Sequence, residues 1–556
     1  MTHDLSAPPE RRDQAPPKTE TDAASPKPGD RGAADPGRSA AASLRRLALR
    51  VHFYAGVLVG PFLLVAALTG FFYALAPQAE KVVYHSWTTS QSEEIRVPLG
   101  TQIATAEREL PDLSLSSVVV GSPGQNTRVL FDDPQLPSSS YTRVVFVDPS
   151  TGDVPAVSVQ YGSGQALPLR TWLSEVHRRL HLGEPGRIYS ELAASWLAPI
   201  ALFGLYIWWD RRRRSGAPLL WLRRERSGAR WWGGPSRAGH RNRHAVLGAW
   251  IAIALLGLSA TGLTWSLFAG ENVSGLRAAA GWETPSLGGG GEHAGHSTAA
   301  GAEASGSDGP DAQGMQDAQG MQDMEGVDGI NMPGMDMPGM GHEQAMEHHP
   351  AMPPADAPAT VLRSSLEAGL SLPLQLTPPA AEGEAWDVAE TRRSYTAGPD
   401  SARIDPATGG VVDRLDFADY PAAAKLADWG IRAHMGMLFG VVNQLLLAAV
   451  AASLCVVIVR GYVMWWKRRP GAGRAWGATE THRPLRLGRA PAPGAFVALA
   501  RSHPVRTGIA ALLVAAIGYF VPLLGLSLVA FLAIDLVVKG ARRLASSCRL
   551  ARVNRT

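Results

Sequence analysis

Cysteine is scarce in this chain of 556 residues, and its scarcity excludes several kinds of site. Only Cys455 and Cys548 occur, which is too few for a disulfide framework, a zinc site ligated by cysteines or an iron–sulfur cluster. The chain also lacks a G-x-G-x-x-G segment between a strand and a helix. We therefore expect no nicotinamide or flavin domain within the chain, so that electrons for any redox reaction would come from another molecule.

Charged residues are also sparse, at 18% of the chain, and they are nearly absent from several long apolar runs. Four of these runs are near or above the ~20 residues that a helix needs to cross a bilayer. A fifth stretch, residues 507–538, is too long for one ordinary span and contains Pro522. It is either a helical hairpin, which we favour, or one kinked helix. The four clear runs are residues 53–76, 188–209, 245–268 and 438–466.

Arginine and lysine gather at the ends of these runs. All of these ends lie on one side of the membrane if the N-terminus is cytoplasmic, as the positive-inside rule predicts. Their position explains the net charge of +4 without a nucleic-acid partner, and we expect none. The first apolar run lies far from the N-terminus and is full length, so it predicts an uncleaved signal anchor. The basic groups are Arg45, Arg46 and Arg50, residues 211–214, the arginines of 223–243, residues 467–469, and residues 542–543.

Four histidines occupy matched positions in two copies of one sequence module. Ionisable residues in or beside membrane spans are costly and usually functional, and their recurrence in register favours a shared role over packing at the membrane interface. His52 precedes Gly56 and Thr69-Gly70, as His244 precedes Gly248 and Thr261-Gly262; His177 precedes Gly204 and Trp208-Trp209, as His434 precedes Gly461 and Trp465-Trp466.

The topology divides the histidines into two pairs. His52 and His244 lie at the cytoplasmic ends of their spans, whereas His177 and His434 lie at the opposite ends. Each pair can meet across the pseudo-two-fold axis of a four-helix bundle, where cofactor sites are commonly built. Two imidazoles on one iron make a six-coordinate b-type haem suited to electron transfer, and the lack of a C-x-x-C-H segment excludes covalent attachment. The pattern predicts two b haems.

Helix rise sets the level of the Thr-Gly pairs. Seventeen residues separate Thr69 from His52, which places Thr69 roughly 25 Å along the helix and near the level of the His177–His434 pair. Thr261 is matched to Thr69. Their neighbouring glycines either let a porphyrin face approach the backbone or allow close helix packing.

His181 has no counterpart in the second copy. It follows His177 by one helical turn, and Leu438 stands at the matched position. It is either a substitute ligand, a proton donor or metal contact, or a surface histidine. The paired tryptophans after each closing run are typical of interfacial anchors.

A strand–turn–strand pattern repeats between the apolar runs. Asp-Pro followed by Thr-Gly occurs at Asp148 and again, as Asp-Pro-Ala-Thr-Gly, at Asp405, with apolar alternation on both sides, and this turn chemistry predicts paired strands. The two aspartates are offset by 257 residues, as are the histidines before the second and fourth runs, whereas His52 and His244 are offset by 192. The second copy therefore has 65 additional residues.

The composition places this insertion at residues 288–354, which are rich in Gly, Ala, Asp, Met and His. Thioethers two or three residues apart in a flexible backbone can bind Cu(I), and imidazole accepts Cu(II). The segment is therefore either a copper-binding or silver-binding insertion, which we favour, or a low-complexity linker. Its candidate metal ligands are Met332, Met335, Met337, Met340, His342, Met346, His348 and His349.

At these residues the chain resembles the PepSY-associated transmembrane family, which includes bacterial iron-regulated membrane proteins and ferric-siderophore reductases. The matching features are the His-x3-Gly…Thr-Gly openings, the Asp-Pro-x-Thr-Gly turn and the His…Gly…Trp-Trp closings within about 45–470, together with Leu-Gly-Leu-Ser-Leu and Asp535 near the C-terminus. The resemblance implies a haem-bearing reductase of the bacterial inner membrane that acts on ferric chelates. The insertion departs from the usual pattern and leaves iron and copper as alternative substrates.

The expected fold is an α-helical integral membrane protein. A pseudo-two-fold four-helix haem-binding bundle and a C-terminal helical hairpin would carry two α+β PepSY-like extracytoplasmic domains. The expected function is an electron conduit from a quinol or cytoplasmic reductase to a ferric-siderophore or copper complex; the alternative is a non-redox metal-binding or transport accessory protein. The expected segments are a disordered tail 1–44, spans 45–76, 188–210, 244–268 and 434–467, PepSY-like domains 77–187 and 269–433, cytoplasmic loops 211–243 and 468–504, a hairpin 505–540 and a tail 541–556.

Overall fold

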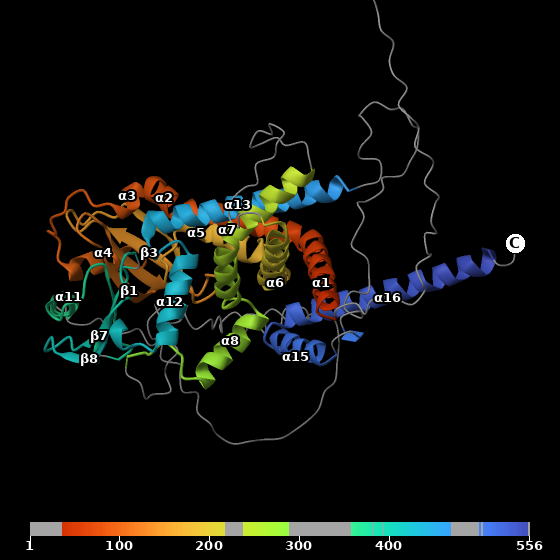
Figure 1. Cartoon of the computed structure of the whole chain (residues 1–556). Coiled ribbons are helices and arrows are strands. Elements are labelled where there is room, and N and C mark those ends of the chain that lie inside the picture. The colour runs from red at the N-terminus through yellow and green to blue at the C-terminus, as the bar shows by residue number, and fades with distance from the viewer. Residues whose placement is uncertain are drawn as a thin grey trace, which may run out of the picture.

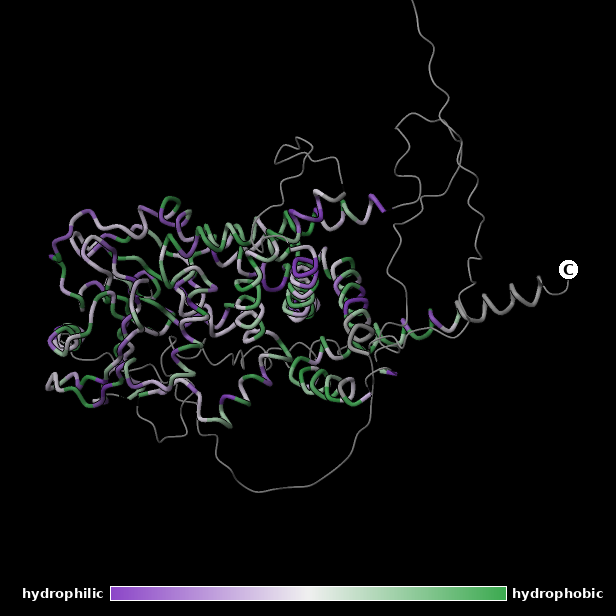
Figure 2. The backbone as a smooth tube through the Cα atoms, in the orientation of Figure 1, coloured by the Kyte–Doolittle hydropathy of each residue, from purple (hydrophilic) through white to green (hydrophobic). Residues whose placement is uncertain are grey.

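Long apolar helices dominate the computed structural model, which describes residues 36–216, 237–287, 357–381, 383–392, 394–468, 500–501 and 504–553. Five helices in this part of the chain are long and apolar enough to cross a membrane. Hydrophobic stretches follow these helices in Figure 2. The five segments are Gly60–Val83, Glu184–Ser215, Gly239–Leu263, Gly440–Trp466 and Pro522–Ala541, and Thr507–Phe520 is a shorter apolar helix.

The predicted spans correspond to helices whose ends differ from the predicted ones. The first expected span is divided into α1 (Pro36–Leu58) and α2 (Gly60–Val83). Because α1 begins at Pro36, the expectation of a disordered tail is wrong for residues 36–44; residues 1–35 lie outside the described part. The other spans are α6 (Glu184–Ser215), α7 (Arg237–Leu263) and α13 (Gly440–Trp466).

The boundary between α1 and α2 has a local cause. Pro61 has no backbone N–H, so the carbonyl of Val57, four residues earlier, lacks its helical donor. The Tyr462 hydroxyl from α13 donates to the Val57 oxygen at 2.7 Å. Gly60 permits this approach, because a Cβ at that position would lie 2.9 Å from the tyrosine oxygen. The proline thus interrupts the helix, and a side chain of a neighbouring helix pairs with the carbonyl that the interruption leaves free.

The four helices α2, α6, α7 and α13 pack in a closed ring. Helix α13 contacts α2 and α7, while α6 contacts α7 and α2. Helix α1 extends the first of them and packs mainly against α6. The bundle is joined to a sheet, which lies toward the left of Figure 1. A four-helix arrangement therefore lies beside a separate β layer.

Each histidine that precedes a closing span lies on a short helix of its own. His177 is near the end of α5 (Pro168–Arg179), and His434 ends α12 (Ala422–His434). After α5 the chain turns through Leu180 and His181, both in the left-handed region with φ of 53° and 52°. After α12 it turns at Gly436, with φ of 75°. Both copies therefore break before the span.

The two segments between the spans contribute to one sheet rather than to two. The eight-stranded sheet has the order β4-β3-β2-β1-β5-β6-β7-β8, with four strands from each segment. Strands β1 and β5 pair antiparallel at its centre, where Val119 lies opposite Gln375. The strands are β1 (Ser114–Val120), β2 (Thr127–Asp132), β3 (Tyr141–Val147), β4 (Ala156–Tyr161), β5 (Leu374–Thr377), β6 (Trp386–Glu390), β7 (Ser401–Ile404) and β8 (Val411–Leu415).

One face of the sheet packs against helices α4 (Leu99–Glu109) and α11 (Ala357–Glu367). Valines of β1 and β3 alternate into a core with Leu374, Trp386 and Ile404 from the second segment, and Ile103 and Val361 cover them. The remaining short elements are α3 (His85–Thr88), α8 (Phe268–Ala279) and the 3-10 turn Phe417–Asp419. Because the core is shared, the two segments stabilise each other.

The Asp-Pro turns join the strands that the sequence predicts. Between β3 and β4, Gly152 N–H donates to the Asp148 carbonyl at 2.8 Å; between β7 and β8, Gly409 N–H donates to the Asp405 carbonyl at the same distance. Both glycines have positive φ, 80° and 73°, a conformation that glycine adopts without steric cost. The strand–turn–strand prediction is confirmed in both copies.

The C-terminal apolar stretch forms two helices, α15 (Pro504–Phe520) and α16 (Pro522–Val553), which pack against each other. Gly518 and Gly525 allow close approach, since a Cβ on Gly518 would lie 2.9 Å from the Gly525 Cα. Helix α16 continues well past residue 540, where a tail was expected. It packs on the bundle: Trp196 Nε1 of α6 donates to Ser527 Oγ at 2.8 Å.

Candidate functional site

The His52 and His244 rings face each other at the end of the bundle farther from the sheet, and we call them the distal pair. Their ring centres are 6.1 Å apart and their planes are inclined by 77°. His52 Nδ1 lies 2.9 Å from the Ile200 carbonyl oxygen, and His244 Nδ1 lies 2.9 Å from the Val457 carbonyl oxygen. A carbonyl can only accept, so each Nδ1 carries the proton and each Nε2 keeps its lone pair.

Glycines of the closing spans make room for these rings. A Cβ on Gly204 would lie 3.0 Å from Cε1 of His52, and one on Gly461 would lie 3.7 Å from Cε1 of His244. Each glycine follows the accepting carbonyl by one helical turn, so one surface of α6 and of α13 both seats and orients an imidazole. The sequence repeat contains Gly204 and Gly461, but spacing alone did not identify them as contacts of the histidines.

The Gly204 contact gives a direct test. Gly204→Ala should displace the His52 ring, because 3.0 Å is shorter than an ordinary carbon contact, and should destabilise the folded protein by about 1–3 kcal/mol. Gly257→Ala is the matched control, since its Cβ would meet nothing within 4 Å. Thermal unfolding in detergent measures the difference. Equal stability of the two variants would show that the ring does not depend on this glycine.

His177 and His434 form the second pair, which we call the proximal pair because it lies at the sheet end of the bundle. Thr69 Oγ1 is 2.8 Å from Nδ1 of His177, and Thr261 Oγ1 is 2.6 Å from Nδ1 of His434. Each hydroxyl also lies within hydrogen-bond distance of a carbonyl in its own helix, Val65 or Gly257. A hydroxyl that donates to that carbonyl accepts from the imidazole, which again leaves Nε2 with its lone pair.

The neighbouring glycines pack against the same rings. A Cβ on Gly70 would lie 3.1 Å from Cε1 of His177, and one on Gly262 would lie 3.6 Å from Cε1 of His434. Tyr73 stacks near His177 with ring centres 6.5 Å apart. The two roles considered for these glycines were contact with a porphyrin and packing between helices; the contact observed is with the imidazole rings.

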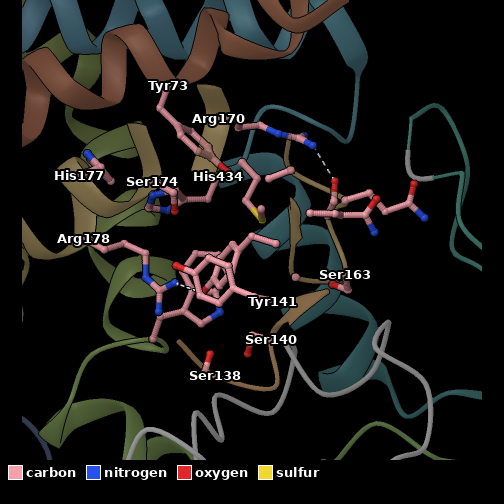
Figure 3. Close-up of a pocket in the computed structure, with 18 of the residues that line it drawn as sticks. Tyr73, Ser138, Ser140, Tyr141, Ser163, Arg170, Ser174, His177, Arg178 and His434 are labelled. Atoms are coloured by element: carbon pink, nitrogen blue, oxygen red, sulfur yellow. Dashed lines mark hydrogen bonds between the residues drawn. The ribbon is translucent and has the colours of Figure 1, made fainter. Parts of the chain in front are cut away.

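A cavity of about 1790 Å³ opens between the bundle and the sheet, and both proximal histidines line it. Its bundle end is apolar, with Leu63, Leu197 and Leu454 among the lining residues. Its sheet end is polar and rich in hydroxyls. Figure 3 shows Tyr73, His177 and His434 above the loop that carries Ser138 and Ser140.

Two side chains illustrate the polar end. Arg178 Nη1 donates to the Tyr161 hydroxyl at 2.5 Å. Burial and the nearby Glu175 carboxylate raise the pKa of Tyr141 to about 12, so its hydroxyl stays protonated as a donor. The cavity therefore joins an apolar slot between helices to a polar chamber. Hydroxyls, the arginines Arg178 and Arg187, and the carboxylates of Asp132, Asp133 and Glu283 line this chamber.

The remaining candidates are placed differently. His181 is exposed and contacts Trp172, with ring centres 5.5 Å apart, and it does not line the cavity. Gly56 and Gly248 face open space, because a Cβ on either would meet nothing within 4 Å. The candidate methionine and histidine ligands of 288–354 lie outside the described residues.

The fold and the site define a membrane protein with apolar spans and two pairs of half-buried histidines. The sequence model of the PepSY-associated transmembrane region matches residues 49–468, and the chain belongs to this family. No curated protein matches the chain in sequence.

Proposed function

We propose that the protein is a transmembrane electron conduit that holds two b-type haems and reduces a metal complex for metal uptake. The observation that carries the proposal is the geometry of the distal pair. A transition metal bound by two imidazoles at roughly 2 Å each separates their ring centres by about 6 Å, and the observed separation is 6.1 Å.

The protonation of the four histidines supports the same assignment. Haem iron binds the unprotonated imidazole nitrogen, and a hydrogen bond from the other nitrogen fixes the tautomer and the ring orientation. Carbonyls provide this acceptor in the distal pair, and threonine hydroxyls provide it in the proximal pair. The donor set and its supporting contacts therefore fit axial ligation.

The large cavity supports a haem at the proximal pair. It exceeds the roughly 300–1,000 Å³ of an ordinary small-molecule site, at about 1790 Å³. Its apolar end suits a porphyrin, and its hydroxyl-rich end suits a polar second ligand. Haem bound at the two pairs would supply one-electron transfer between the two sides of the membrane.

The proposed reaction takes electrons from a quinol or a cytoplasmic reductase and delivers them to Fe(III)-siderophore or Cu(II) at the polar chamber. Reduction would release iron, because oxygen ligands suit the hard ferric ion better than the ferrous ion. In this proposal the protein lies in a bacterial inner membrane with its N-terminus in the cytoplasm, and the sheet with both PepSY-like segments faces outward.

The alternative, a non-redox metal-binding or transport accessory protein, has less support. In the described segments, no group of three or more His, Cys, Asp and Glu side chains could hold a metal ion. The histidines come in pairs, which suits axial ligation of a haem better than direct binding of an ion.

A visible spectrum of the purified full-length protein tests the proposal. After haem-replete expression, a reduced-minus-oxidised difference spectrum should show b-type haem at about two per chain. In vesicles with a reduced quinol inside, ferric or cupric chelate outside should be reduced. Absence of the b-type signal would refute the conduit. A variant that lacks residues 288–354 is the companion experiment. Its haem content should be unchanged and its copper binding should fall. Unchanged copper stoichiometry would identify the insertion as a linker only.

A further inference from the structure

A cationic wall separates the large cavity from a second cavity of about 310 Å³. Ser163, Gly164, Gln165 and Arg170 line both cavities, and we call these four residues the Arg170 wall. They come from the turn after β4 and from the start of α5, two helical turns before His177. Figure 3 shows Arg170 and Ser163 in the same view as the proximal pair.

Arg170 has N–H donors to spare. It is 8% exposed, and its Nε lies 3.2 Å from Glu80 Oε2. Its Nη2 donates to the Gly164 carbonyl at 2.8 Å, and its backbone N–H donates to Glu80 Oε1 at 2.9 Å. Its Nε makes no hydrogen bond within the described residues despite its proximity to Glu80, and no contact with them uses Nη1. This buried cation therefore retains unused N–H groups beside both cavities.

Gln165 provides a second donor, oriented by a second arginine. Arg128 Nη1 donates to Gln165 Oε1 at 3.2 Å and to Gln160 Oε1 at 3.3 Å. Because the Gln165 oxygen faces Arg128, its Nε2 points away, and this buried nitrogen has no hydrogen-bond partner in the described structure. Burial, together with the charge of Arg170, lowers the pKa of Arg128 to about 10, so Arg128 remains a cation at neutral pH.

Positive charge exceeds negative charge around the wall. Three cationic side chains adjoin it, those of Arg170, Arg128 and Lys81. The carboxylate that pairs with Arg170 is that of Glu80. None of the described residues that line the second cavity is acidic. Buried charge without a partner is costly, and a carboxylate accepts readily from both an arginine and an amide N–H.

We propose that the Arg170 wall binds a carboxylate group through Arg170 and the Gln165 amide. The carboxylate has two sources: a propionate of the haem at the proximal pair, which rests on the proposed function, or a free carboxylate ligand that enters the second cavity. The matched positions in the second copy are Ala427 for Arg170 and Asn272 for Glu80. The site therefore occurs once per chain and breaks the pseudo-symmetry of the bundle.

The first arm of the test compares haem with haem dimethyl ester, which lacks free carboxylates, in full-length apoprotein. If a propionate is bound, the wild type should prefer haem by about tenfold or more, and Gln165→Met should reduce this preference. Arg170→Gln should abolish it, and Arg96→Gln, at an exposed arginine, should not. Because Arg170→Gln leaves Glu80 buried without its partner, the double variant Glu80→Gln/Arg170→Gln repeats the measurement in a neutral site.

The second arm measures thermal unfolding of the purified protein with acetate, with acetamide and chloride at matched concentrations as controls. If a free carboxylate is bound, acetate alone should raise the melting temperature, and this shift should disappear in the Arg170 and Gln165 variants. This arm needs no haem, so it still tests the wall if the conduit proposal fails. No ester discrimination together with no acetate-specific shift would overturn the carboxylate site.

Discussion

His434→Ala should remove one of the two haems and leave the other in place. His434 lines the large cavity, and its Nδ1 is held by Thr261 at 2.6 Å, so its Nε2 is the proposed ligand. The distal pair uses different helices and different acceptors, Ile200 and Val457. Haem per protein, measured by extraction and absorbance, should fall by about half, and one of two transitions should vanish from a redox titration.

His181→Ala is the matched control for this experiment. It removes the same chemical group from the same end of the bundle, but His181 is exposed and packs on Trp172. Its haem content should equal that of the wild type. Retention of both haems in His434→Ala, or loss of one in His181→Ala, would contradict the proposed pairing.

Asp535→Ala should destabilise the folded protein by about 3–5 kcal/mol, because removal of one partner leaves a buried charge uncompensated. Asp535 of α16 forms an ion pair with Arg50 of α1, and their side chains are only 7% and 5% exposed. Arg50 also lies over the Tyr54 ring, 4.9 Å from its centre. The pair thus connects the C-terminal hairpin to the helix that carries His52.

Unfolding in detergent measures this loss, and two further variants interpret it. Glu94→Ala breaks an ion pair whose side chains are about two-thirds exposed, so it should cost under about 1 kcal/mol. Replacing both buried partners, as Arg50→Met with Asp535→Leu, should restore much of the stability. An Asp535→Ala protein as stable as Glu94→Ala would show that the hairpin is held by apolar packing alone.

The sequence predicts well the features that depend on local chemistry. Charge-poor runs of this length indicate helical spans, because backbone N–H and C=O groups must be hydrogen-bonded inside a bilayer and a helix satisfies them within one segment. Asp-Pro and Thr-Gly around Gly152 and Gly409 indicate tight turns because those residues favour turn conformations. Helix rise alone predicted that Thr69 lies at the level of His177, and in the structure the two side chains are in contact.

Features that depend on the approach of distant segments could not be predicted. The carbonyls of Ile200 and Val457 are ordinary backbone groups, so no residue pattern marks them as acceptors for His52 and His244. The sharing of one sheet by both segments depends on β1 pairing with β5 across more than 250 residues. The Pro61 break shows the same limit, because the Tyr462 hydroxyl that pairs with the freed Val57 carbonyl lies 405 residues away in the chain.

The sequence by itself determined the membrane spans, the internal repeat, the four matched histidines and the size of the insertion, since each follows from residue type and spacing. Only the tertiary structure decided which atoms meet. It placed the ring centres of His52 and His244 6.1 Å apart. It also oriented each of the four imidazoles so that its Nδ1 is hydrogen-bonded to a carbonyl or a threonine hydroxyl. It also joined Arg170 and Gln165 in one wall beside the cavity. Hydrogen bonds and burial act over a few ångströms, and only the packed helices and sheet bring these groups within that range.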